Sequence, residues 1–153
     1  MDWLIELDKI CFHLINQSGS ITWDSLMLFS SHKLSWTPIY ILLVYLIIKE
    51  KGKESIWILI SIGLVIACCD IGSVHLFKNT FQRLRPCHFF DDVRLVTEKC
   101  GGQYGFISSH ASNVFGLAIL VGKLMNRKIL FVVLFIWATV VAYSRVYLGV
   151  HYP

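Results

Sequence analysis

Three short clusters in the second half of the sequence carry side chains that could handle a phosphate group. They are Lys78 with Arg85 and Pro86, then Ser108, Ser109 and His110, and last Ser144 and Arg145 with His151. The arginine fork matches phosphate oxygens, and lysine adds a point charge. Of two histidines, one could attack phosphorus while the other protonates the leaving oxygen. Because phosphoryl transfer needs little beyond positioning and charge neutralisation, we expect phosphate-ester chemistry without a metal or another cofactor.

The composition indicates that these clusters belong to a small membrane protein. Hydrophobic residues make up 56% of the 153 residues and charged residues only 16%, whereas a soluble domain has about 45–50% and about 25%. A net charge of +4 is too small to suggest a nucleic-acid partner. We expect one domain over residues 1–153, with the lipid bilayer as its partner and its oligomeric state left open.

Apolar stretches predict four spanning helices in an all-α integral membrane bundle. They cover residues 34–48, 55–77, 108–125 and 129–143. An amphipathic helix over residues 2–15 is too charged to span and should lie at the interface. A second short helix is expected over residues 22–31, with Thr22 or Asp24 near its N-cap.

Loop charges predict the orientation of these spans. The short loops 49–54 and 123–128 are basic and emerge on one side if the spans alternate, which places them in the cytoplasm. All three clusters then lie at the outer ends of the spans, where Ser108 and Ser109 open a helix whose amides favour an anion. Asp70 and His75, inside the second span, should face the bundle interior.

Two cysteines flank the polar loop that joins the second and third spans. Cys87 and Cys100 could form a disulfide if this loop faces an oxidising compartment. The sequence leaves this open, because it does not show whether the sulfur atoms meet.

The three clusters, from Lys78 to His151, resemble the signature of the type 2 phosphatidic acid phosphatase family, within the lipid phosphatase and vanadium haloperoxidase superfamily. That pattern is Lys, six residues, Arg-Pro; then Pro-Ser-Gly-His; then Ser-Arg, five residues, His, three residues, Asp. Ile107 and Ser109 replace its proline and glycine, and its aspartate would fall two residues after Pro153. Such family members usually have six spanning helices. The resemblance therefore implies that residues 1–153 are C-terminally incomplete and, alone, impaired in activity.

The resemblance also implies a role for each matching residue. His151 would be the nucleophile that forms a phosphohistidine, and His110 the general acid. The phosphate-binding residues would be Lys78, Arg85, Ser108, Ser109 and Arg145. Ser109 could narrow the pocket or add a hydroxyl donor. Two further cations of the loop, Arg83 and Arg94, are interpreted as headgroup anchors outside the site.

These observations favour a membrane lipid phosphatase that hydrolyses a lipid phosphate monoester or pyrophosphate. Undecaprenyl pyrophosphate, phosphatidylglycerol phosphate and lipid A phosphate all fit. The small size and short loops favour a bacterial source. With the orientation given by the loop charges, we expect an inner-membrane protein whose site faces the periplasm or outside. Two alternatives stay open: a family phosphatase acting on a soluble phosphate ester, and a non-catalytic membrane adaptor that binds phosphorylated lipid.

Overall fold

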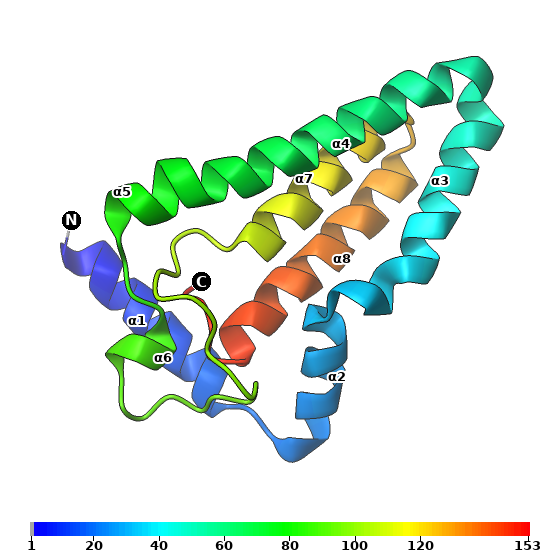
Figure 1. The fold of residues 1–153 in the computed structure, drawn as a ribbon. Coiled ribbons are helices and arrows are strands. Elements are labelled where there is room, and N and C mark those ends of the chain that lie inside the picture. The colour runs from blue at the N-terminus through cyan, green and yellow to red at the C-terminus, as the bar shows by residue number, and fades with distance from the viewer. Residues whose placement is uncertain (1) are drawn as a thin grey trace.

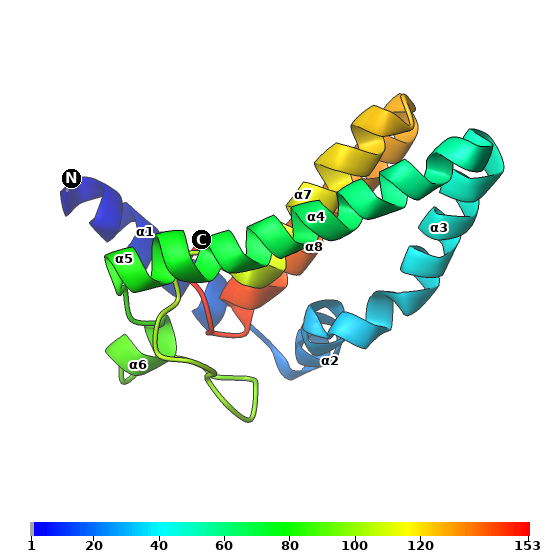
Figure 2. The ribbon, with the colours of Figure 1, turned by 45° about the horizontal axis from the view of Figure 1, so that its top comes forward.

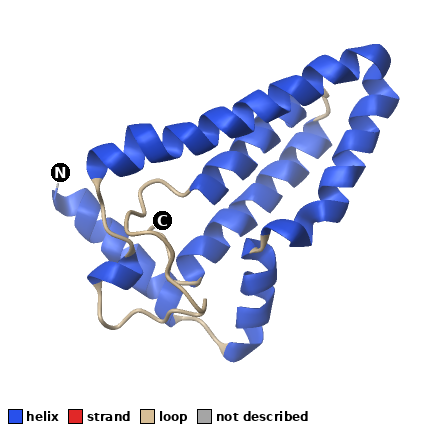
Figure 3. Ribbon diagram, in the orientation of Figure 1, coloured by secondary structure: helices blue, strands red, loops and turns tan. Residues whose placement is uncertain are grey.

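The structure is a computed structural model that describes residues 2–153, and in this part of the chain all regular elements are helical (Figure 3). The α-helices are α1 (Asp2–Gln17), α2 (Ile21–Ser31), α3 (Thr37–Lys51), α4 (Ser55–Gly72), α5 (Asn79–Phe81), α6 (Pro86–Phe89), α7 (Ser109–Leu124) and α8 (Lys128–Tyr147). Short 3-10 helices, η1 (Lys33–Trp36) and η2 (Gly52–Glu54), flank α3. A π-helical segment, η3 (Ser73–Lys78), joins α4 to α5.

Four long helices, α3, α4, α7 and α8, form the bundle (Figure 1). Helix α7 packs along both α8 and α4, and the buried cluster between the helices consists mainly of aliphatic side chains and Trp137. The outward faces are also apolar: Ile129 is 81% and Trp57 70% exposed. Two helical stretches, Lys33–Phe81 and Lys128–Tyr147, are long and apolar enough to cross a bilayer. The exposed apolar surface is what a bundle surrounded by lipid requires.

The two basic loops lie at the same end of the bundle, as the alternation of spans predicts (Figure 1). After α3 the chain reverses at Gly52, whose φ of +52° is the left-handed conformation that favours glycine. Arg127, in the turn between α7 and α8, forms an ion pair with Glu50 at 2.9 Å. This contact ties the α3–α4 turn to the α7–α8 turn.

The opposite end is covered by α1, α2, α6 and the long loop that precedes α7 (Figure 2). Asn16 of α1 is fully buried there. Its Nδ2 donates to the carbonyls of Arg94 and Tyr147, each at 2.9 Å, and its Oδ1 accepts from the Arg94 N–H, also at 2.9 Å. Helix α1 is therefore fastened to both the loop and the end of α8. The apolar side chains Trp3 and Leu14 remain exposed on α1.

The structure corrects three details of the sequence interpretation. The N-cap of α2 is Ser20 rather than Thr22 or Asp24, because the Ser20 carbonyl accepts the first N–H groups of that helix. His75 is exposed instead of facing the interior. Helix α8 continues one turn past the expected end at residue 143, and this added turn carries Arg145.

Candidate functional site

A cavity of about 460 Å³ opens near the end of the bundle that carries the long loop. It is bounded by the junction of α2 and η1, by α3, α4, η3, α7 and α8, by the loop that carries Arg85, and by the segment after α8. Six of the seven predicted site residues line it: Lys78, Arg85, Ser109, His110, Arg145 and His151. The structure therefore brings three cations and two imidazoles from distant parts of the sequence around one space.

Ser108 is the predicted residue that does not line this cavity. It is the N-cap of α7, and its hydroxyl accepts a hydrogen bond from the Ala111 N–H at 3.4 Å. It lines a neighbouring cavity of similar size, to which Arg145 and His151 also contribute. Its evident contribution is therefore to begin helix α7 beside the site.

Lys78 reaches the site from the π-helical segment η3. A π turn contains an extra residue and so changes the direction of the side chains that follow it. The Lys78 Nζ donates to the Ser109 hydroxyl at 2.9 Å, and the Ser73 hydroxyl lies 2.5 Å from the same oxygen. Ser109, which replaces the glycine of the family pattern, thus supplies a hydroxyl that holds Lys78 in place.

Arg85 is buried, with 9% of its surface exposed, and its donors are aimed by backbone carbonyls. Its Nε donates to the Gly102 carbonyl at 2.6 Å. Its Nη1 donates to the Val150 carbonyl at 2.9 Å and to Nε2 of His151 at 2.7 Å. Burial lowers the pKa of Arg85 from its ordinary high value. Among the described residues Nη2 has no acceptor, so its two hydrogens remain for a bound oxyanion.

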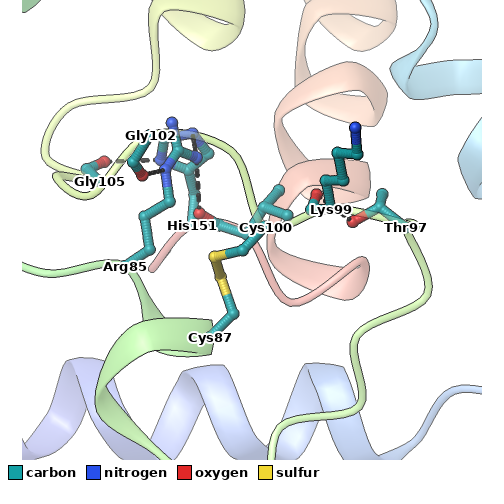
Figure 4. The surroundings of a disulfide bond; sticks show 9 residues. Arg85, Cys87, Thr97, Lys99, Cys100, Gly102, Gly105 and His151 are labelled. Carbon is teal, nitrogen blue, oxygen red and sulfur yellow. Dashed lines mark hydrogen bonds between the residues drawn. A yellow bond between two sulfur atoms is a disulfide. The ribbon is translucent and has the colours of Figure 1, made fainter.

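Gly105 allows the loop to pass directly over Arg85 (Figure 4). A Cβ atom at Gly105 would lie 2.9 Å from Cγ and 3.2 Å from Cα of Arg85, so any other residue here would push the two loop segments apart. This close approach places the Gly105 carbonyl 2.6 Å from Nδ1 of His151. The sequence contained no signal for this contact.

These contacts determine which nitrogen of His151 carries the proton. The Gly105 carbonyl can only accept, so Nδ1–H donates to it and Nε2 holds the lone pair that accepts from Arg85. Burial, together with the Arg85 and Arg145 cations, lowers the pKa of His151 to about 2. His151 is therefore a neutral imidazole at pH 7, with the lone pair of Nε2 directed at Arg85 beside the cavity.

Arg145 and His151 are held together by the turn that ends α8. The N–H groups of Val150 and His151 both donate to the Arg145 carbonyl, each at 3.2 Å. The turn needs Gly149, which has φ +82° and lies where a Cβ would meet Val93 at 2.8 Å. The Arg145 Nη1 donates to the Ser31 hydroxyl, while its Nε is buried without a partner among the described residues. That unused donor is a candidate for binding substrate.

Cys87 and Cys100 form a disulfide, which the sequence left open. One cysteine lies two residues after Arg85, and the other lies two residues before Gly102, whose carbonyl binds Arg85 (Figure 4). The bond therefore joins the two loop segments that fix the position of the guanidinium group.

Removing this disulfide should lower both stability and turnover. A loop of about 15 residues closed by a disulfide contributes about 3 kcal/mol, so reductant should lower the melting temperature in detergent by roughly 6–12 °C. A Cys87→Ser/Cys100→Ser variant should match the reduced protein, while Cys11→Ser, which keeps the bond, should respond to reductant like wild type. If reductant lowered the melting temperature of the double variant as much as that of wild type, the disulfide would not be the source of the effect.

The structure adds cavity-lining residues that sequence reasoning did not assign to the site. Asp70 is the acidic residue among those that line the cavity; Ser31 and Lys33 enter from the N-terminal part of the chain, and Asn113 from α7. An asparagine in an apolar spanning helix was a usable signal. The sequence contains no such signal for Ser31 and Lys33, because only tertiary packing brings them close to the three clusters.

Arg83 and Arg94 are not free headgroup anchors. Arg83 forms an ion pair with Asp8 at 2.5 Å and stacks over the Tyr152 ring at 3.6 Å. Arg94 forms an ion pair with Asp24 at 2.5 Å, which lowers the pKa of that carboxyl group. Both arginines fasten the N-terminal helices to the loop and the C-terminal segment. Four other cations, with one carboxylate, remain around the cavity and favour a multiply charged anion.

Comparison with known proteins links this chain to phosphatases. Residues 54–153 match the model of the PAP2 superfamily. The chain is 34% identical to the lipid A 4'-phosphatase of Porphyromonas gingivalis, over 99% of this chain and 66% of that protein. It is 32% identical to the lipid A 4'-phosphatase of Bacteroides thetaiotaomicron, over 100% and 70% of the two chains.

A third relative carries a different name. The chain is 33% identical to the undecaprenyl-diphosphatase of Sulfolobus acidocaldarius, over 93% of this chain and 66% of that protein. The chain thus spans about two thirds of the length of these relatives. No solved structure matches the chain.

Proposed function

Since this chain belongs to the PAP2 superfamily, we propose that it is a membrane phosphatase that removes phosphate from a lipid through a phosphohistidine at His151. The observation that carries this proposal is the hydrogen-bonded arrangement of His151. The Gly105 carbonyl accepts from Nδ1–H, and the lone pair of Nε2 lies beside a cavity that is also lined by His110 and four cations. A neutral imidazole held this way is prepared to attack an electrophile that the cations bind.

The first step joins phosphorus to His151. The substrate phosphate accepts hydrogen bonds from Lys78, Arg85 and Arg145, and the Arg85 Nη1–H redirects its hydrogen bond from His151 Nε2 to a phosphate oxygen without losing the proton. The freed lone pair then forms the N–P bond while the bond to the leaving oxygen breaks. His110 donates a proton to that oxygen, which leaves as the lipid alcohol, or as a lipid phosphate when the substrate is a diphosphate.

The second step restores the enzyme. His110, now neutral, accepts a proton from a water molecule whose oxygen attacks phosphorus. The N–P bond breaks, Nε2 regains its lone pair, and inorganic phosphate leaves the cavity. Ser109 acts in both steps by holding Lys78 through its hydroxyl. Ser108 contributes by beginning helix α7, whose N-terminal amides favour the anion.

A lipid substrate is favoured over a soluble ester by an apolar groove that continues from the cavity. The groove, of about 230 Å³, lies between α3, α4 and α7. It shares four residues with the cavity lined by His151 and the cations, here called the phosphate cavity: Tyr40, Ile66, Asn113 and Val114. Its remaining walls are aliphatic. A hydrocarbon chain attached to a bound phosphate could therefore stay in an apolar environment.

We propose a bacterial inner membrane as the location, with the site on the periplasmic or outer side. The basic turns at the far end of the bundle favour the cytoplasm. The Cys87–Cys100 bond lies at the end that carries the site, in keeping with an oxidising compartment. Lipid A 4'-phosphate and undecaprenyl diphosphate, taken from the names of the relatives, are the first substrates to test.

The test is phosphate release by the protein of the complete gene, purified in detergent. We expect kcat/KM for lipid A or undecaprenyl diphosphate to exceed that for p-nitrophenyl phosphate by about tenfold or more, because the apolar groove contributes only with a lipid. Vanadate should inhibit, and EDTA should not. Loss of activity in EDTA would indicate a metal mechanism. Binding of lipid phosphate without release would favour the adaptor, and equal activity on the soluble ester would favour the soluble-ester phosphatase.

A further inference from the structure

Asn113 has a polar atom that the fold itself does not use. It lies on α7, where its side-chain Oδ1 is buried and has no hydrogen-bond partner among the described residues. A buried amide oxygen without a partner costs free energy, and polar residues in spanning helices are expensive. Stability therefore gives no reason for an asparagine here, whereas a ligand that donates a hydrogen bond would.

The position of Asn113 relates it to one part of the substrate. It follows His110 by three residues, so the two side chains lie on the same face of α7, with Asn113 one turn further along the helix. It also lines both the phosphate cavity and the apolar groove. A lipid phosphate whose leaving oxygen is at His110 must therefore pass Asn113 before its hydrocarbon part enters the groove.

The chemistry at that point differs between lipid classes. A polyprenyl chain has only carbon and hydrogen beyond its phosphate groups, and the second phosphate of a diphosphate would place an anion beside the amide oxygen. A sugar or glycerol scaffold instead carries hydroxyl or amide N–H groups a few bonds from the phosphate. Such a donor satisfies Oδ1.

We propose that Asn113 is a specificity-determining residue that binds a hydrogen-bond donor adjacent to the scissile phosphate. The preferred substrates are then phosphate monoesters on a sugar or glycerol scaffold rather than polyprenyl diphosphates. This inference rests on the proposed function and narrows its substrate class. Lipid A 4'-phosphate and a glycerophospholipid phosphate share the required chemistry, and the choice between them is made by experiment.

A matched pair of substrates isolates the interaction. Lysophosphatidate has a free hydroxyl next to its phosphate-bearing carbon, and its 2-deoxy analogue differs only by lacking that hydroxyl. We expect the wild-type kcat/KM to be about 10- to 100-fold higher for lysophosphatidate, since sites built to bind a hydroxyl discriminate strongly against its absence. Asn113→Leu should reduce this ratio to about one, mainly by losing activity on lysophosphatidate.

Controls separate specificity from a structural effect. Ser112→Ala changes the adjacent residue, which lines the neighbouring cavity, and should keep the wild-type ratio. The melting temperature of Asn113→Leu should not fall, because no hydrogen bond of the fold is removed. Parallel assays with lipid A, phosphatidylglycerol phosphate and undecaprenyl diphosphate identify the scaffold, and Asn113→Leu should weaken activity on the first two only.

The outcomes distinguish this inference from its premise. A wild-type ratio near one, or an equal loss of activity on both members of the pair in Asn113→Leu, would contradict the role of Asn113 while leaving the phosphatase intact. If the wild-type protein releases phosphate from none of the lipids, the proposed function itself fails.

Discussion

Replacing His151 by glutamine should lower the rate of phosphate release by about ten-thousandfold or more, because losing a covalent nucleophile removes the reaction pathway itself. Glutamine can still donate to the Gly105 carbonyl and accept from Arg85, the two contacts that hold the histidine ring. The expected result is thus a folded, substrate-binding protein without turnover. Steady-state phosphate release, with the melting temperature as a check on folding, measures it.

Trapping the intermediate makes the test specific to His151. With a substrate labelled in its phosphate, acid-labile label should appear on the wild-type protein and be absent from His151→Gln. His75→Gln is the matched control, since His75 is exposed on η3 and does not line the cavity. Turnover of His151→Gln within tenfold of wild type would remove His151 as the nucleophile.

Arg145→Ala should lower turnover by on the order of a hundredfold or more, as the loss of a donor that stabilises transition-state charge commonly does. Its buried Nε has no partner within the described chain, so the substrate phosphate is the expected acceptor. Arg145→Lys should recover only part of the activity, because an ammonium group cannot provide two parallel donors. Rates at saturating substrate report the loss of kcat separately from any change in KM.

Arg127→Ala is the control for Arg145, because Arg127 pairs with Glu50 at the far end of the bundle. It should leave kcat near the wild-type value. An effect of Arg145→Ala smaller than threefold would place Arg145 outside the site.

The sequence predicts those features of the fold that depend on local patterns. The second spanning helix begins at Ser55 as expected, and the third is capped by Ser108 as its position before an apolar run suggests. The all-α membrane bundle and the family follow from hydropathy and from three spaced motifs. Three expectations stay predictions: an aspartate four residues after His151, six spanning helices in a complete family member, and a single domain.

Other features depend on contacts between residues far apart in the chain, which spacing does not encode. The loop position of Arg94 suggests a headgroup anchor, whereas its ion-pair partner, Asp24, belongs to a helix far away in the sequence. The Gly105 carbonyl orients His151 through a backbone atom, and any residue type carries such an atom. Backbone groups therefore escape a search for reactive side chains, even where they determine the tautomer of the proposed nucleophile.

The buried Asn16 has a practical consequence for protein engineering. The region matched by the family begins at residue 54, so a variant trimmed to that boundary would discard Asn16, Asp24 and Ser31. Their partners in the loop and at the end of α8 would then lose the contacts that hold them. In chimeras with other phosphatases, the first two helices should consequently be exchanged as one piece with the loop and the C-terminal segment.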